Sequence, residues 1–192
     1  MSSHGVLSLA RRTLARAGAV FPRSTIVHEV VTRGSVDATP ELVWRRIVLY
    51  EDVPHAPPLL LRLLLPVPLR TSKPGLTVGA LVQCSYSGGG RLVKRITEVR
   101  PPLLVRFEVI EQRLGIETCF TTLAGAYDIR ESSKGSEVAL TTRYLGHLRP
   151  RWLWRHPERW LAHELHRHIL RGMGARFQAP GSTRPVLEQP EP

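Results

Sequence analysis

Three histidines stand close together near the C-terminal end of the sequence, at positions 163, 166 and 168. Imidazole groups at short spacing can bind a metal ion or move a proton. The surrounding segment predicts a helix, and its period places His166 inside the apolar face, with His163 and His168 near the edges. The three rings should not converge, so we expect no metal site. Two interpretations of His166 stay open: a hydrogen-bonded core histidine, or a polar group that faces a pocket.

Alternation along a strand predicted over residues 103–113 supplies further polar candidates, because every second side chain shares one face of a strand. The more apolar set should face the core, and it carries Glu111 and Arg113 at its end. These two side chains could bind a polar ligand group or form a solvated ion pair, and both interpretations stay open. The inward sets of strands and helix together give the predicted pocket residues: Tyr86, Val105, Phe107, Val109, Glu111, Arg113, Tyr144, His166, Ile169 and Met173.

Proton transfer is the chemistry that such a pocket could support. His166, Glu111 and Tyr144 are the groups able to accept or donate a proton in an otherwise apolar site. The sequence contains no Gly-x-Ser-x-Gly, Gly-x-Gly-x-x-Gly or Cys-x-x-Cys motif, and hence no nucleophile, dinucleotide or dithiol signature. We therefore keep these three residues as candidates, assign no catalytic residue and expect no cofactor.

The elements that would position these side chains follow a recognisable order. A strand over residues 25–36 leads into Thr39 and Pro40, which suit the N-cap and first position of a short helix. Further strands are predicted over residues 76–86, 91–99, 103–113, 116–130 and 137–145. Their short connections indicate an antiparallel meander, and Gly125 suggests a bulge. An amphipathic helix over residues 157–177 follows. This order predicts an α+β helix-grip fold, in which a curved antiparallel sheet wraps around a long C-terminal helix, with short helices after the first strand.

The connection between the first helix and the meander is unusually apolar. Residues 59–65 are all leucine except Arg62, and prolines lie on both sides of them. Leucine favours a helix, and β-branched residues are absent, so a short helix is expected. It could be a wedge that closes one end of a cavity or a lid over the cavity mouth, and both interpretations stay open.

Five short segments carry a resemblance to a known superfamily. They are residues 36–44 (Val-Asp-Ala-Thr-Pro-Glu-Leu-Val-Trp), 75–79, 96–102 (Ile-Thr-Glu-Val-Arg-Pro-Pro), 107–109 and 127–129. With the long terminal helix, they resemble the SRPBCC superfamily of START-related and pollen-allergen-like helix-grip proteins. The resemblance covers residues 25–178 and is closest to bacterial polyketide cyclase/dehydrase-like proteins. Because these segments are framework residues, it implies the fold and a ligand cavity without choosing among carriers, receptors and cyclases.

Composition and chain ends set the domain organisation. A chain of 192 residues is long enough for one domain with its own core. Residues 1–24 form a basic leader, expected to be disordered or loosely helical, and a targeting role for it stays open. Residues 25–178 form the ligand-binding domain, and residues 179–192 a disordered, proline-rich tail. Cys84 and Cys119 are expected as buried thiols in strands. No apolar run reaches the roughly 18 residues of a membrane span, and we expect a cytoplasmic protein.

The net charge of +11 comes from 27 basic residues, of which only three are lysine. A GC-rich coding sequence and attraction to an anionic surface both explain an excess of arginine, and both stay open. Residues 148–160 interleave tryptophan with arginine, which suits a membrane interface. The alternative is a connector whose tryptophans pack under the long helix. We predict weak contact with anionic membranes through this segment, and we do not expect nucleic acid, because no binding motif accompanies the charge.

Together these features predict a protein that binds a small hydrophobic or amphipathic molecule, lipid-like or aromatic and polyketide-like, between sheet and helix. A cyclase- or dehydratase-like enzyme acting in the same cavity is one alternative. A peripheral membrane or interaction protein is another.

Overall fold

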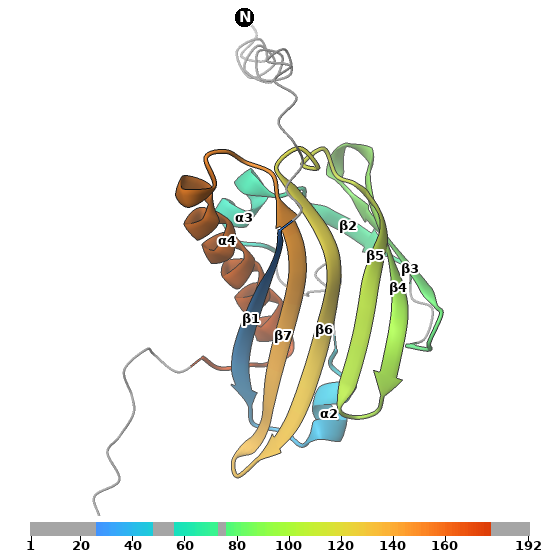
Figure 1. The fold of residues 1–192 in the computed structure, drawn as a ribbon. Coiled ribbons are helices and arrows are strands. Elements are labelled where there is room, and N and C mark those ends of the chain that lie inside the picture. Colours follow the sequence, from blue (N-terminus) through green and yellow to red (C-terminus); the bar gives the residue numbers. More distant parts are fainter. Residues whose placement is uncertain (1–25, 48–55, 73–75, 178–192) are drawn as a thin grey trace, which may run out of the picture.

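A curved antiparallel sheet forms the centre of the computed structural model, which describes residues 26–47, 56–72 and 76–177 (Figure 1). Within these residues its seven strands are β1 (Val27–Val36), β2 (Pro68–Thr71), β3 (Leu81–Tyr86), β4 (Gly90–Arg100), β5 (Leu104–Arg113), β6 (Phe120–Ser132) and β7 (Gly135–Gly146). Their order across the sheet is β1-β7-β6-β5-β4-β3-β2. The meander from β2 to β7 is therefore extended by β1, which pairs with the last strand along its full length.

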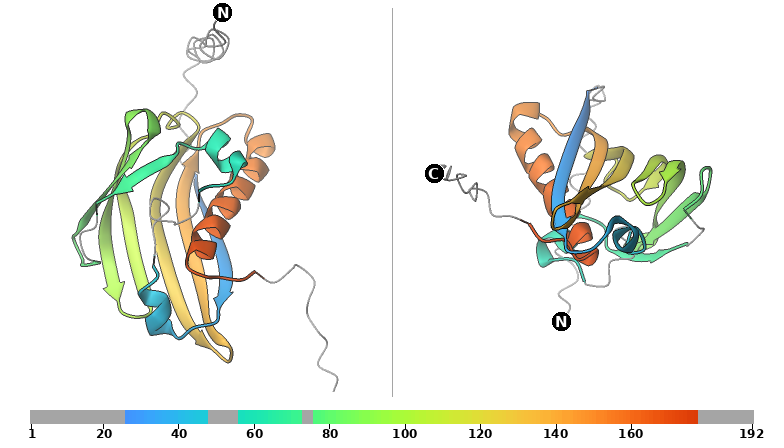
Figure 2. Two further views of the ribbon diagram at one scale, coloured as in Figure 1. Left: turned by 180° about the vertical axis from the view of Figure 1, so that it is seen from behind. Right: turned by 90° about the horizontal axis from the view of Figure 1, so that it is seen from below.

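Helices cover one face of this sheet. Figure 2 shows α4 (Arg151–Gly172) lying along the concave face on the side of β1 and β7, with α2 (Pro40–Trp44) and α3 (Leu59–Leu64) toward opposite ends. A short 3-10 turn, η2 (Ser87–Gly89), joins β3 to β4. The predicted curved sheet around a long C-terminal helix is confirmed, as are the two short helices after the first strand. None of the helices in the described part of the chain is long and apolar enough to cross a membrane.

The hydrophobic core lies between the concave face of the sheet and the second half of α4. On β5, Val105 and Phe107 are buried whereas Arg106 and Ile110 are exposed, as the two-residue period of a strand requires. The same alternation buries one set on β3, β6 and β7, and α4 adds Ile169 and Leu170. Each fully buried side chain of this size stabilises the fold by about 1.5–3 kcal/mol relative to exposure. The predicted inward faces of the strands are thus correct.

The start of α4 differs from the prediction. Pro157 was expected at the first position of the helix, because its ring suits that position. Instead the helix begins at Arg151 and passes through Pro157 without ending. Proline there removes one N–H group from the helical hydrogen bonds, and contacts of the first turns, described below, stabilise this part of the helix.

The end of α4 also differs, since the helix stops at Gly172 and not at Phe177. Gly174 has a φ of 87°, a conformation that glycine adopts without steric cost. Its N–H donates to the carbonyl of Arg171 at 2.9 Å, and the N–H of Ala175 donates to the carbonyl of Leu170 at 2.9 Å. This pair of bonds is a Schellman motif, which ends a helix.

Two predicted strands are shorter than expected, because their first residues form turns. Residues 76–80 precede β3, and residues 116–119 precede β6, where the N–H of Cys119 donates to the carbonyl of Ile116 at 2.8 Å. Cys119 is therefore half-buried in a turn, which corrects the prediction of a strand, whereas Cys84 is buried in β3 as expected. Neither cysteine forms a disulfide.

The sequence analysis did not predict strand β2, because prolines lie at and before its start. Residues Pro66 and Pro68 were read as breaks, but Pro68 is the first residue of β2. Proline is tolerated there because β2 is an edge strand of the sheet.

Smaller expectations can also be compared with the structure. Thr39 and Pro40 occupy the N-cap and first position of α2, although the Thr39 side chain makes no capping hydrogen bond. The register of β6 shifts between Thr122 and Ala124, next to the bulge predicted at Gly125. The leader of residues 1–24 and the tail of residues 179–192 lie outside the described residues.

Candidate functional site

A cavity of about 400 Å³ lies between the first half of α4, the end of α3 and the concave face of the sheet. Most of its wall is apolar, formed by Leu64, Leu65, Pro66, Leu92, Leu114, Ile116, Phe120, Leu148, Trp154, Pro157, Trp160, Leu161, Ala162 and Leu165. The remaining lining residues are Tyr86, Cys119, Thr122, Thr142, Glu158 and His166. A volume of this size and a mostly apolar wall with few polar groups are typical of small-molecule sites.

The helical period explains which side chains of α4 reach the cavity. Leu161 and Leu165 are four residues apart, as are Ala162 and His166, so each pair lies on one side of the helix. Glu158 lies one turn before this group on the same side. The apolar face predicted for the helix therefore covers the cavity in its first half and the core in its second half.

His166 is the buried polar centre of the cavity wall, with 1% of its surface exposed. Its Nε2 lies 2.8 Å from the hydroxyl of Thr142, and its Nδ1 lies 3.0 Å from the hydroxyl of Thr32. Thr32 comes from β1 and Thr142 from the neighbouring strand β7. The imidazole thus joins the helix to the two strands beneath it, and of these groups Thr142 and His166 line the cavity.

A second histidine shares this network. The Nδ1 of His163 lies 2.7 Å from the same Thr32 hydroxyl. Residues three apart on a helix are neighbours, which brings His163 and His166 to the same hydroxyl. No group of three His, Cys, Asp or Glu side chains in the described residues is placed to hold a metal ion.

Burial decides the protonation of His166. Desolvation lowers the pKa of this imidazole to about 3, and repulsion from His163 acts in the same direction. His166 is therefore neutral near pH 7, with one ring nitrogen donating and the other accepting. A group with this pKa is a weak general base at neutral pH, so its role in the wall is hydrogen bonding.

An ion pair between Arg151 and Glu158 adjoins the cavity, and Glu158 lines it. The guanidinium of Arg151 donates two hydrogen bonds to the Glu158 carboxylate, at 2.7 and 2.9 Å, and Glu158 is only 8% exposed. Arg151 Nη2 also lies 2.9 Å from Nε2 of His28. Burial and the charge of Arg151 lower the pKa of His28, so its Nε2 can accept from the guanidinium. The sequence analysis did not predict this ion pair, because a helix that starts at Pro157 excludes Arg151.

Tyr144 lies one layer behind the cavity. It is fully buried, and its ring stacks on Phe120 with 4.4 Å between the ring centroids. Its hydroxyl has no hydrogen-bond partner among the described residues. Burial is the main cause that raises its pKa, and the nearby Glu158 carboxylate adds to it. This phenol therefore stays protonated and supports the wall formed by Phe120.

Comparison with known proteins identifies the fold. No protein-family model and no curated protein matches the sequence, but solved structures do. Protein CV1439 from Chromobacterium violaceum superposes with a TM-score of 0.50 at 15% identity, over 76% of this chain and 93% of that protein. Ara h 8.0201 also gives a TM-score of 0.50, at 9% identity, over 78% of this chain and 99% of its own. The chain has the helix-grip fold.

A third similar structure is norcoclaurine synthase from Thalictrum flavum in complex with dopamine and hydroxybenzaldehyde. Its TM-score is 0.47 at 14% identity, over 89% of this chain and 95% of that protein. The helix-grip fold predicted from the sequence is confirmed by the two superpositions that have a TM-score of 0.50. They do not single out the polyketide cyclase/dehydrase-like branch.

Within this helix-grip domain, the predicted pocket residues separate into groups. Tyr86 and His166 line the cavity. Most of the others belong to the core beyond the cavity or to the layer behind its wall: Val105, Phe107, Val109, Tyr144, Ile169 and Met173. The prediction gave the correct face of each strand and of the helix, but not the position along it.

Glu111 and Arg113 lie outside the cavity lining. The Glu111 carboxylate accepts from Arg91 Nη2 at 2.5 Å and pairs with Arg113 Nε at 2.9 Å. The hydrogen bond from Arg91 is the main cause that lowers the pKa of Glu111. Of the two interpretations left open for this pair, the structure shows the ion pair at the strand end.

Several lining residues were missed because their sequence signals were weak. Thr142 is two residues before Tyr144 and shares its face of β7, but its hydroxyl was not considered as a partner for His166. Trp154 lies before the predicted start of the helix, in a segment interpreted as a membrane interface or a connector, whereas residues from Arg151 onward form the first turns of α4. Packing of the tryptophans beneath the long helix is also wrong, since Trp152, Trp154 and Trp160 are exposed on the helix itself.

Proposed function

We propose that this protein binds a small hydrophobic or amphipathic molecule in the cavity between α3, α4 and the sheet. The observation that carries the proposal is the cavity of about 400 Å³, whose wall is built mainly from leucine, isoleucine, phenylalanine and tryptophan side chains. Removing apolar ligand surface from water supplies about 25 cal/mol per Å². A ligand with a substantial hydrocarbon or aromatic part therefore fits this wall best.

Polar groups on the wall favour an amphipathic ligand over a pure hydrocarbon. Thr142 and the neutral His166 offer a hydroxyl and an imidazole that are already hydrogen-bonded to each other. The Glu158 carboxylate can only accept hydrogen bonds when ionised. A ligand hydroxyl is the simplest group that satisfies them, because it both donates and accepts.

Binding of a neutral fluorescent probe tests this proposal. N-phenyl-1-naphthylamine has no charge that the basic protein could attract, and its emission should rise when it enters the cavity. The variant Leu161→Trp places a larger side chain in the wall and should weaken probe binding by about tenfold, equivalent to about 1.4 kcal/mol. Leu153→Trp is the matched control, because Leu153 is exposed on the same helix and does not line the cavity.

Two results would contradict the proposal. One is a wild-type protein that is folded by circular dichroism and does not enhance probe fluorescence. The other is equal probe affinity in the wild type, Leu161→Trp and Leu153→Trp, with all three proteins equally stable.

An enzyme acting in the same cavity receives less support. Of the three candidate proton-transfer groups, Glu111 lies outside the cavity and Tyr144 lies behind its wall. His166 lines the cavity, but a pKa of about 3 makes it a weak base at neutral pH. Simple binding therefore requires fewer additional assumptions than cyclisation or dehydration.

A further inference from the structure

The cavity opens to the surface between α3 and α4. Four residues line the cavity and are also substantially exposed: Leu64 of α3 (50%), and Trp154 (37%), Pro157 and Trp160 (47%) of α4. Residues that belong to both the wall and the surface mark the mouth. Since α3 contacts α4, both helices form the rim of this mouth.

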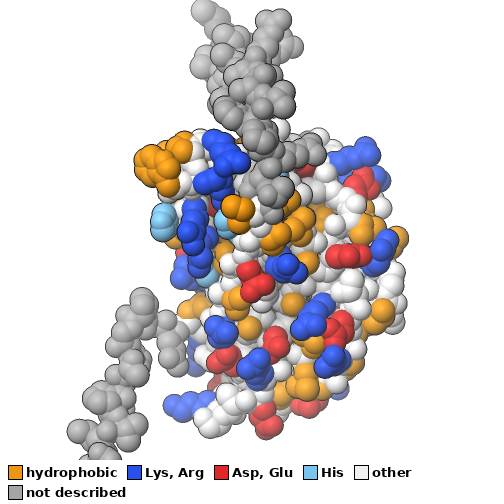
Figure 3. Space-filling view, in the orientation of Figure 1, with side chains coloured by type: hydrophobic (Ala, Val, Ile, Leu, Met, Phe, Trp, Pro, Cys, Tyr) orange, Lys and Arg blue, Asp and Glu red, His pale blue; other side chains and the backbone are white. Residues whose placement is uncertain are grey.

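Further apolar side chains extend this rim outward. Leu59 and Leu63, four residues apart on one side of α3, are 75% and 82% exposed, and Trp152 in the first turn of α4 is 76% exposed. We refer to Leu59, Leu63, Leu64, Trp152, Trp154 and Trp160 as the mouth surface. Figure 3 shows apolar side chains gathered over the start of α4. Apolar residues concentrated in this way mark a contact site for another molecule or a membrane.

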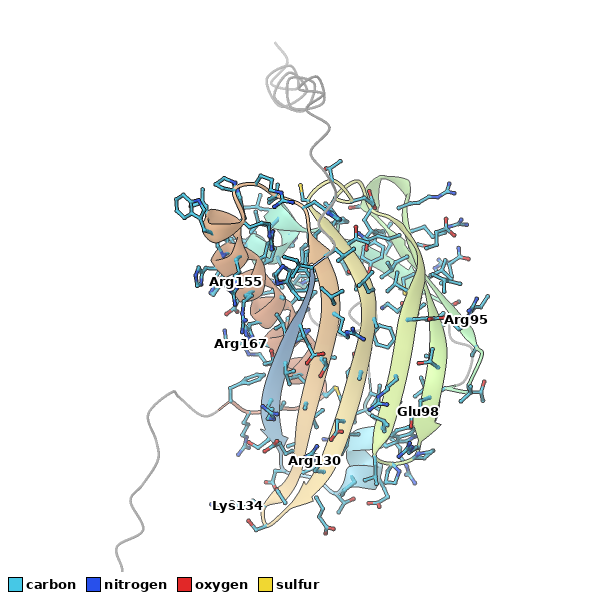
Figure 4. The ribbon with its side chains drawn as sticks, viewed as in Figure 1. Arg95, Glu98, Arg130, Lys134, Arg155 and Arg167 are labelled. Atoms are coloured by element: carbon cyan, nitrogen blue, oxygen red, sulfur yellow. The ribbon has the colours of Figure 1, made fainter. Side chains whose placement is uncertain are left out.

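Basic side chains without acidic partners accompany the mouth surface. Arg62 lies on α3 among its leucines, and Arg155 and Arg159 are exposed on α4. No ion pair is formed by these three arginines within the described residues, whereas the two acids of α4 are already paired: Glu158 with Arg151, and Glu164 with Arg167. Arg155 and Arg167 lie along the outer edge of α4 in Figure 4. The rim therefore combines exposed tryptophan and leucine with a local excess of positive charge.

An anionic lipid bilayer matches both properties. Tryptophan rings settle at the level of the lipid headgroups, leucine side chains bury in the acyl boundary, and arginine is attracted to anionic lipids. A protein partner would explain the apolar residues but would need its own acidic groups opposite Arg62, Arg155 and Arg159. A bilayer also explains why the apolar surface surrounds the entrance of an apolar cavity.

We propose that the mouth surface docks on anionic membranes, so that the ligand passes between bilayer and cavity without crossing water. The exchange route rests on the proposed ligand binding, but the docking does not, because the surface can bind a bilayer while the cavity is empty. Failure of one proposal is therefore distinguishable from failure of the other.

Vesicle flotation with the full chain and no ligand tests the docking. We expect binding to vesicles of phosphatidylcholine containing about a quarter phosphatidylglycerol, little binding to phosphatidylcholine alone, and a decrease at high salt. Trp152→Ala and Leu63→Ala should each weaken binding several-fold, and because both side chains are exposed neither change should unfold the protein. Arg155→Glu should weaken it by about fivefold or more, since each basic residue near the surface contributes a factor of about five.

Matched controls come from the opposite end of the molecule. Leu103→Ala removes an exposed leucine in the turn between β4 and β5, and Lys134→Glu reverses an exposed charge in the turn between β6 and β7, which Figure 4 shows far from α4. Both variants should float with the same vesicles as the wild type.

Three results would overturn the docking surface. The first is the absence of flotation with anionic vesicles at low salt. The second is equal loss in the Arg155→Glu and Lys134→Glu variants, or wild-type binding in all mouth variants, which would place the contact in diffuse charge or elsewhere in the chain. The third is a self-associated protein that becomes monomeric on Trp152→Ala, which would make the mouth surface an interface between two copies.

Discussion

At the scale of single residues, hydrogen-bond partners and burial decide the role of a polar side chain in the cavity more than its residue type does. His166 has ring nitrogens close to the hydroxyls of Thr32 and Thr142, and it is almost completely removed from water. Burial of an imidazole favours its neutral form. The residue type alone allowed a proton-transfer role, but the environment gives a hydrogen-bonding one.

The depressed pKa of His166 predicts an acid-sensitive stability. The folded imidazole has a pKa of about 3, against 6.5 for an ordinary histidine, so between these values the unfolded chain binds the additional proton. Stability is therefore greatest above pH 6.5 and is lost as the pH falls toward 3. Linkage assigns about 2 kcal/mol of this loss to His166 between pH 7.5 and 5. Denaturant unfolding of the wild type across this range measures the loss.

His166→Gln should remove most of this pH dependence, because glutamine keeps hydrogen-bonding capacity but does not titrate. His28 and His163, whose pKa values are also lowered by burial, should retain a smaller slope of the same sign. His156→Gln is the control, since His156 is exposed on α4. An unchanged slope in His166→Gln would show that this imidazole is not the cause.

At the scale of elements, α4 shows which features of the sequence were decisive. The spacing of Leu161, Leu165 and Ile169 correctly predicted a helix and the face it buries. Its start was not predictable from local rules, because Pro157 favours a first position. Contacts of Arg151 stabilise the first turns instead: it pairs with Glu158 two turns further along the helix, and it contacts His28 of β1, which is distant in the sequence. Such tertiary contacts are not visible in a local pattern.

The pairing of β5 with β6 predicts a specific cost for a small substitution. Gly125 lies opposite Phe107, and a Cβ on Gly125 would overlap the aromatic ring. Gly125→Ala should therefore lower the free energy of unfolding by about 1–3 kcal/mol, the usual cost of overpacking a core. Denaturant unfolding measures the loss, and a shorter side chain in Phe107→Leu should relieve it. Equal costs of Gly125→Ala in the wild-type and Phe107→Leu backgrounds would rule out this steric contact as the cause.

At the scale of the whole molecule, the space between sheet and α4 is divided into a filled end and an open end. Ile169 and Met173 pack in the filled end, whereas Leu161 and Leu165 line the open end. Sequence periodicity predicts which face of an element points inward, and this was correct for most residues. It does not predict where along the element the core stops, because that depends on the curvature of the sheet and on where α3 packs. For this reason Phe107 was predicted as a pocket residue and lies in the core.

The two cysteines can be used to probe the open end and the filled core separately. Cys119 lines the cavity and is half-buried, whereas Cys84 is fully buried in the core. N-ethylmaleimide should therefore modify Cys119 in the native protein and Cys84 only on unfolding, because the reagent must reach the thiolate.

Bound N-phenyl-1-naphthylamine should slow the modification of Cys119, as followed by mass spectrometry of the labelled peptide. At a probe concentration that saturates the wild type, Leu153→Trp should keep this protection and Leu161→Trp should lose most of it. If the probe binds to the wild type by fluorescence but leaves the Cys119 rate unchanged, it occupies a different site and the cavity is not the binding site.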